Sequence, residues 1–197
     1  MSDCPFVSRG GLKLRHALDQ FQLDIKGFTC VDLGCSTGGF TDCMLQAGAA
    51  KVYAVDTAYG QLAWKMRNDP RVVVCERSNG LHLEAREQVD LAVADMGWTP
   101  QRLLIPAALK WLKPTGEIIT LIKPHYELKD IGRSELPRGG VLEEAAALEV
   151  TEEVVRRLPQ LGVEVISLTK SPVLGGAHKG KGTGNAEWLA RARPAMR

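Results

Sequence analysis

The sequence lacks several features that would define a protein class at once. No apolar run approaches the roughly 20 residues needed to span a bilayer, which argues against an integral membrane protein. Its five cysteines form no C-x-x-C pair and no Cys/His cluster with zinc spacing, so we expect neither a metal site nor a disulfide scaffold. The odd cysteine count, and an opening segment without the apolar stretch of a secretory signal, indicate a cytoplasmic protein with reduced thiols. The formal net charge of +2 neither requires nor excludes a nucleic-acid partner.

Short apolar segments alternate with amphipathic ones along most of the 197 residues. Strands are expected at 28–33, 51–55, 71–75, 89–94, 117–123, 163–168 and 186–190, and helices at 8–21, 41–48, 61–67, 101–112 and 142–158. Ser8 is the expected cap of the first helix. Strands that alternate with helices pair in parallel through right-handed crossovers, with helices on both faces of the sheet. The pattern therefore predicts one doubly wound α/β domain.

The turn after the first strand, from Asp32 to Phe40, is informative because such sheets bind ligands where their strands end. A dinucleotide site requires G-x-G-x-x-G, but Ser36 replaces the second glycine and the Asp32 carboxylate would repel a diphosphate. S-adenosylmethionine (SAM) fits better, with Asp32 expected to face its ammonium and loop N–H groups to receive its carboxylate. Asp56, at the end of the second strand, suits the two ribose hydroxyls of an adenosine. The plainer interpretation is a tight turn and a solvated aspartate.

Two charged residues close neighbouring strands, Asp95 the fourth and Lys123 the fifth. Parallel strands with these ends bring opposite charges together at the ligand crevice, and burying a lysine there is costly for a structural role alone. The pair is either chemically active or an internal ion pair that fixes the strand ends. Lys13 on the first helix and Glu187 at the start of the last strand are unremarkable alone, although Glu187 reaches the same edge if its strand runs antiparallel.

Several segments together resemble the FtsJ-like ribose methyltransferases, and within them the TlyA branch of ribosomal RNA methyltransferases, which also carries the label haemolysin A. The segments are VSRGGLKL (7–14), VDLGCSTGGFTDC (31–43), KVYAVD (51–56), YGQLAWK (59–65), RNDPRV (67–72), IKP (122–124) and GNAEW (184–188). The likeness spans nearly the whole chain and is dense in motifs, so we regard it as specific.

The resemblance implies a single Rossmann-like SAM methyltransferase domain over residues 1–197, with a helical segment at 1–24 and a core at 25–197. Its α/β sheet would have seven strands, mostly parallel, with an antiparallel last strand. Members of the family carry an N-terminal S4-type RNA-binding domain, and we expect that domain to be absent here.

The resemblance also implies methyl transfer from SAM to a ribose 2′-hydroxyl of RNA, through the tetrad Lys13, Asp95, Lys123 and Glu187. Lys123 would deprotonate or steer the hydroxyl, Lys13 would supply a cation that lowers the pKa of Lys123, and the two carboxylates would orient the amines. The residues expected to hold SAM are Asp32, Gly34, Ser36, Thr37, Gly38, Gly39, Phe40, Asp56, Asn79 and Asp95.

The sequence departs from the family on the substrate side. Met96-Gly97-Trp98-Thr99-Pro100 replaces an apolar-Ser-Phe-Ile-Ser run, and Pro124-His125-Tyr126-Glu127 replaces Pro-Gln-Phe-Glu. Trp98 and Tyr126 are candidates to stack on a splayed nucleotide, although a tryptophan beside a strand end is as often core packing. Basic side chains that could bind a phosphate backbone are Arg9 and, in two long loops, Arg133, Arg138, Lys179 and Lys181. The alternative is that these side chains are simply solvated.

Three functional classes stay open. The first is an RNA ribose 2′-O-methyltransferase that acts on ribosomal RNA or a ribosomal subunit. The second is a SAM enzyme with a small-molecule or protein acceptor, which the unusual 96–100 segment favours. The third is a non-catalytic RNA- or SAM-binding protein, or the membrane-lytic protein that the haemolysin label suggests. Against the third class, all four tetrad positions are retained and no amphipathic membrane helix is evident.

Overall fold

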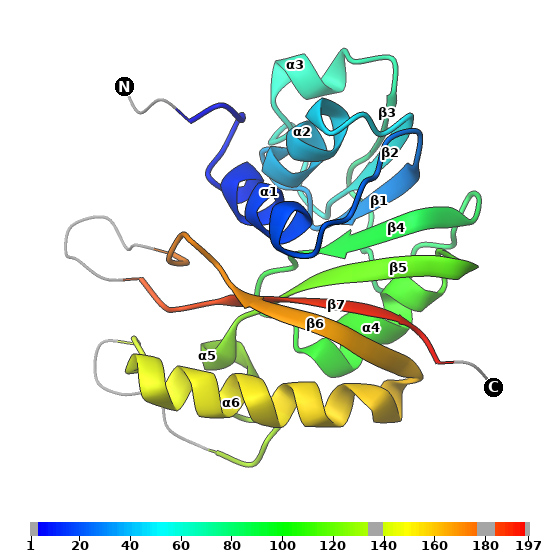
Figure 1. The fold of residues 1–197 in the computed structure, drawn as a ribbon. Helices are drawn as coiled ribbons and strands as arrows, with labels where there is room; N and C mark the ends of the chain where they lie inside the picture. Colours follow the sequence, from blue (N-terminus) through cyan, green and yellow to red (C-terminus); the bar gives the residue numbers. More distant parts are fainter. Residues whose placement is uncertain (1–3, 134–139, 177–183, 196–197) are drawn as a thin grey trace.

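In the computed structural model, which describes residues 4–133, 140–176 and 184–195, a seven-stranded sheet lies between two layers of helices (Figure 1). The strands are β1 (Thr29–Leu33), β2 (Lys51–Val55), β3 (Val72–Cys75), β4 (Val89–Ala94), β5 (Leu112–Ile122), β6 (Val163–Lys170) and β7 (Trp188–Pro194). Their order is β3-β2-β1-β4-β5-β7-β6. The pairs among β1 to β5 are parallel, and β7 is antiparallel to both β5 and β6. The predicted doubly wound sheet with an antiparallel last strand is confirmed.

The helices cover the two faces of the sheet. One layer holds α1 (Gly10–Gln20), α2 (Gly39–Gln46) and α3 (Trp64–Arg67), and the other holds α4 (Gln101–Leu109), α5 (Pro124–Glu127), α6 (Glu144–Arg157) and the 3₁₀ helix η1 (Leu158–Leu161) (Figure 1). Alternate strand residues feed two apolar cores, so that Val31 and Leu33 pack toward α4 and α6 while Cys30 packs toward α1 and α2. None of the described helices is long and apolar enough to cross a membrane.

Several expected boundaries were wrong. The first helix begins at Gly10, and Ser8 does not cap it, because Arg9 is the N-cap residue and makes no side-chain cap bond. The third helix is only one turn long, since the backbone at Ala63 is still extended. β5 begins at Leu112, because Leu112 pairs with Val89. It was expected to begin at 117, after a turn at 113–116. The last strand begins at Trp188, which leaves Glu187 just before it.

Candidate active site

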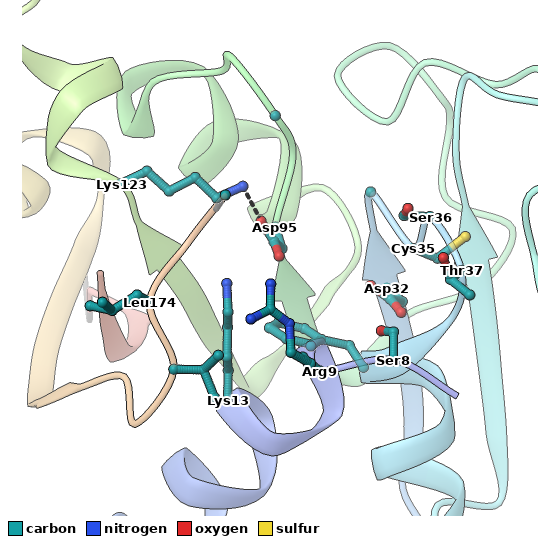
Figure 2. Close-up of a pocket in the computed structure, with 17 residues that line it drawn as sticks. Ser8, Arg9, Lys13, Asp32, Cys35, Ser36, Thr37, Asp95, Lys123 and Leu174 are labelled. Atoms are coloured by element: carbon teal, nitrogen blue, oxygen red, sulfur yellow. Dashed lines mark ion pairs between the residues drawn. The ribbon is translucent and has the colours of Figure 1, made fainter. Parts of the chain in front are cut away.

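A cavity of about 420 Å³ lies where β1, β4 and β5 end, beside the first residues of α1 and α2 (Figure 2). A smaller hollow of about 170 Å³ shares Gly34, Ser36, Asp95 and Gly97 with it. The two hollows therefore form one crevice with Asp95 at their junction. This is the edge of the sheet at which the sequence predicted a ligand.

The turn after β1 is shaped by a glycine that no other residue could replace without strain. Gly34 has a φ of +90°, and a Cβ there would lie 2.6 Å from the backbone oxygen of Asp95. The missing side chain lets the end of β1 touch the end of β4, which brings the loop and Asp95 to the same cavity. Ser36, Thr37, Gly39 and Phe40 also line that cavity, whereas Gly38 is the N-cap of α2 and does not.

Asp32 is a fully buried carboxylate that lacks a cationic partner among the described residues. Its Oδ2 accepts a hydrogen bond of 2.6 Å from the Thr41 hydroxyl, while its Oδ1 is buried with no described hydrogen-bond partner. Burial raises the pKa of this carboxyl to about 7. The Thr41 hydrogen bond lowers the pKa, and the negative charges of Asp95 and Asp56 raise it further. Because Asp32 lines the cavity, its free oxygen fits a ligand that brings its own positive charge, as the ammonium of SAM does.

Asp56 lies at the end of β2 in the smaller hollow. Its two carboxylate oxygens accept 2.8 Å hydrogen bonds from the backbone N–H groups of Ser36 and Ala58. These bonds fix the carboxylate, and each oxygen keeps a lone pair for a hydroxyl donor. Asn79 is placed differently from the expectation: its Oδ1 accepts the Leu81 N–H at 3.0 Å, and its neighbours Ser78 and Gly80 line the hollow instead.

The four residues of the expected tetrad form two ion pairs. Lys123 pairs with Asp95, and Lys13 Nζ lies 2.5 Å from Glu187 Oε2. Figure 2 shows the Lys13 side chain rising from α1 toward the Asp95–Lys123 pair. Asp95 and Lys123 follow β4 and β5 directly, so the sheet itself brings them together.

The charges of the tetrad favour a protonated Lys123. Burial alone would lower the pKa of Lys123, but the charges of Asp95 and Glu187 outweigh it and raise the pKa above its usual value. Lys13, which was expected to supply a cation beside Lys123, forms an ion pair with Glu187. Burial likewise raises the pKa of Glu187, against the opposing effect of Lys13. Each lysine of the tetrad thus has a carboxylate partner in the free protein.

The segment after β6 completes the cavity. The sequence placed this loop on the substrate side, but the lining residues themselves were not predicted. Val173, Leu174 and Gly176 line the cavity, as does Ser8. Gly175 packs directly on the Glu187 carboxylate, where a Cβ would overlap Glu187 Oε1. The cluster of glycines in this region was the available signal, since close backbone approach often requires glycine.

On the substrate side, Trp98 stacks on Tyr126 with ring centroids 4.6 Å apart and an interplanar angle of 29°. Trp98 is 82% exposed, so it is not the core residue that the plainer interpretation allowed. Arg9 lines the cavity, whereas Arg133 pairs with Glu149 of α6 at 3.3 Å and does not. Arg138, Lys179 and Lys181 lie outside the described residues. No group of three or more His, Cys, Asp or Glu side chains in the described ranges is placed to hold a metal ion.

Known proteins share both the sequence pattern and the fold. A family model described as FtsJ-like methyltransferase matches residues 6–180. TlyA of Mycobacterium tuberculosis, a 16S/23S rRNA (cytidine-2′-O)-methyltransferase, is 41% identical over 178 residues, which are 88% of this chain. The chain spans 65% of the length of that relative.

Two solved structures extend the comparison. A protein described as a hemolysin, from Streptococcus thermophilus, is 37% identical with a TM-score of 0.88 over 98% of this chain and 69% of its own. A SAM-dependent methyltransferase from Mesorhizobium loti, 14% identical with a TM-score of 0.58 over 90% of this chain and 96% of its own, shares the fold alone. The resemblance seen in the sequence is thereby confirmed, and the chain belongs to the FtsJ-like methyltransferase family.

Proposed function

We propose that this chain transfers a methyl group from SAM to a ribose 2′-hydroxyl of RNA, with ribosomal RNA as its substrate and the cytoplasm as its location. One observation carries the proposal: the Lys123–Asp95 pair lines the same cavity as Lys13 and the unpartnered oxygen of Asp32. The printed activity of the Mycobacterium tuberculosis relative, methylation of a cytidine 2′-oxygen in rRNA, supports the same reaction here.

The residues at the ends of β1 and β2 suit SAM. Asp32 would pair with the ammonium, the N–H groups of the 34–39 loop would receive the carboxylate, and Asp56 would accept both ribose hydroxyls. When bound, SAM supplies an electrophilic methyl group on a positively charged sulfur. In the free protein, the Lys123 ammonium pairs with Asp95 and is further favoured by the charge of Glu187.

In this mechanism, Lys123 donates an N–H to the 2′-oxygen and turns a lone pair of that oxygen toward the methyl carbon. Asp95 would accept the hydroxyl proton as the 2′-oxygen takes the methyl group that SAM supplies, whose bonding electrons to sulfur would remain on the sulfur. The neutral Lys13–Glu187 pair keeps a second ammonium beside the reacting oxygen without adding net charge. Much of the rate would come from holding oxygen, carbon and sulfur in line.

The substrate side of the crevice favours RNA over a small acceptor. An 82% exposed tryptophan that stacks on Tyr126 offers a flat surface to an unstacked nucleobase. The ammonium of Lys123 lies 5.9 Å from the Tyr126 ring centroid, so this surface adjoins the tetrad. Arg9, at the rim of the cavity, suits a neighbouring phosphate.

The test is methyl transfer from labelled SAM to rRNA and to ribosomal subunits from a strain that lacks the gene. Lys123→Ala should lose about 100-fold or more in kcat while it still binds SAM in calorimetry. Lys113→Ala is the matched control, because Lys113 lies on the same strand and pairs with Asp90; it should keep wild-type activity. Wild-type protein that binds SAM but labels no RNA would refute the proposal and direct the search to other acceptors.

A further inference from the structure

One buried carboxylate outside the tetrad, that of Glu127, lies four residues after Lys123. Glu127, the last residue of α5, is only 3% exposed. Its Oε1 and Oε2 accept the backbone N–H of Gln101 at 3.0 and 3.3 Å. Gln101 is the first residue of α4, whose N-cap, Pro100, has no side-chain oxygen, and the first turn of that helix contains no acidic residue. Glu127 therefore caps α4 from a distant part of the chain.

Gln101 is also bonded to the strand that carries Lys123. Its Nε2 donates to the Leu121 carbonyl at 3.1 Å, and its Oε1 accepts from the Thr120 hydroxyl at 2.8 Å. The Gln101 side chain thus bonds to Thr120 and Leu121, which precede Lys123. The Gln101 backbone N–H bonds to Glu127, which follows Lys123. Both Gln101 and Thr120 are buried, so these bonds face little competition from water.

These contacts close a loop around the reacting pair. The segment from Asp95 leads through Trp98 to Gln101, Gln101 is tied to both flanks of Lys123, and Lys123 pairs with Asp95. The same closure sets Trp98 against Tyr126, the neighbour of Glu127. If the cap on α4 were released, the 95–101 and 123–127 segments would lose their common anchor.

We propose that Glu127 is a positioning residue for methyl transfer, which holds Asp95 in register with Lys123, and Trp98 against Tyr126, by capping α4. The proposal rests on the proposed function, since it assigns a role in the same reaction. Glu127 touches neither SAM nor the acceptor in this account and acts only through Gln101.

The surroundings of Glu127 make its role sensitive to pH. Burial raises the pKa of Glu127 to about 7. The charge of Asp130 also raises this pKa, whereas the hydrogen bond from the Gln101 N–H and the charge of Arg102 lower it. Arg102 pairs with Asp130 at 2.7 Å, and Arg157 of α6, which lines the same small hollow, pairs with Glu153. As pH rises through 7, Glu127 becomes charged and its bond to the helix N-terminus strengthens.

Glu127→Gln tests the proposal, because glutamine keeps the shape but not the charge. We expect kcat at saturating SAM and RNA to fall about tenfold at pH 8, with SAM affinity unchanged. At SAM concentrations that saturate the protein at every pH, the decline of kcat below about pH 7 should be smaller in the variant, because Asp32 titrates in both proteins but the Glu127 carboxyl titrates only in the wild type. The Gln101 amide should exchange hydrogen faster in the variant even without SAM. Glu149→Gln, an exposed carboxylate on α6, is the matched control.

Other outcomes would overturn either the positioning role of Glu127 or the proposed function. Faster exchange at Gln101 with an unchanged kcat would make Glu127 a helix cap only and would overturn the proposal. If Glu127→Gln does not fold, two variants of Thr120 replace it. Thr120→Val should also lower kcat, and Thr120→Ser, which keeps the hydroxyl, should have the wild-type kcat. A wild-type kcat in Thr120→Val would also overturn the proposal. RNA methylation that Lys123→Ala abolishes and Glu127→Gln leaves intact would refute the positioning role alone, whereas absence of methylation by the wild type would refute the proposed function.

Discussion

Asp32 and Glu187 are both buried carboxylates at the cavity, but their charges are compensated differently. Glu187 has the Lys13 ammonium 2.5 Å away, whereas Asp32 has only the Thr41 hydroxyl among the described residues. A buried charge without a cation is unfavourable, so a folded protein retains one where a ligand supplies the missing partner. The charge of Glu187 is therefore already compensated within the protein, whereas Asp32 can accept a cationic group of a ligand.

Asp32 should make SAM binding depend on pH. Since its pKa is about 7, the carboxyl is largely protonated at pH 6 and must lose a proton to pair with an ammonium. We expect the Kd for SAM to rise about tenfold between pH 8 and pH 6 by proton linkage. Asp32→Asn should bind SAM weakly and without this dependence, while Asp19→Asn, at an exposed site, should behave as wild type. Calorimetry measures both effects, and a flat wild-type profile would contradict the assignment of Asp32.

The Lys13–Glu187 pair should matter for stability as well as for catalysis. Lys13→Met leaves the Glu187 carboxylate buried and unpaired, and we expect the free energy of unfolding to fall by about 3 kcal/mol. The double variant Lys13→Met, Glu187→Leu should recover part of that loss, because no buried charge remains. Urea denaturation followed by circular dichroism measures four proteins: the wild type, Lys13→Met, Glu187→Leu and the double variant. Losses that simply add in the double variant would show that the two side chains do not interact.

At the scale of helices and strands, the sequence patterns predicted what is local and missed what depends on packing. The apolar runs that became β1 to β4 were placed within a residue or two. In contrast, Lys113 to Gly116 has the composition of a turn, yet it lies within β5, as an irregularity between the Leu112–Val89 and Glu117–Leu91 pairs. Ser8 has the right chemistry for a cap, but it lines the cavity, and Arg9 occupies the cap position. Local propensity yields to tertiary contact in each case.

The strand-like segment at Gly175 gives an element-scale prediction. Gly175 N–H and C=O bond with Asn185 at 2.9 and 3.1 Å, which fixes its backbone against Glu187. Gly175→Ala should push the flexible end of Glu187 away from Lys13, so we expect kcat to fall about tenfold with SAM affinity retained. Gly132→Ala is the control for backbone strain away from the site, because Gly132 has a φ of +78° and a Cβ there meets nothing within 4 Å. Equal kcat values for the two variants would contradict this role of Gly175.

At the scale of the whole molecule, the site is assembled from parts of the chain that only the fold brings together. Asp95 and Lys123 could be predicted as neighbours, because adjacent parallel strands end at one edge of the sheet. Lys13 and Glu187 could be assigned only through the resemblance, since no spacing rule places a helix and a segment before β7 against each other. The contact of Glu127 with Gln101 left no sequence signal, because a backbone N–H is the donor.

Methylation of a ribose 2′-oxygen differs from methylation of a base in the position of the added methyl group, and that position can be measured. Ribosomal RNA from a strain without the gene would be incubated with SAM and the protein, digested to nucleosides and analysed by mass spectrometry. We expect a new nucleoside with the added mass on its sugar fragment, and we expect that nucleoside to be absent with Lys123→Ala. Added mass on the base fragment, or no methylated nucleoside from a protein that binds SAM, would contradict the proposed function.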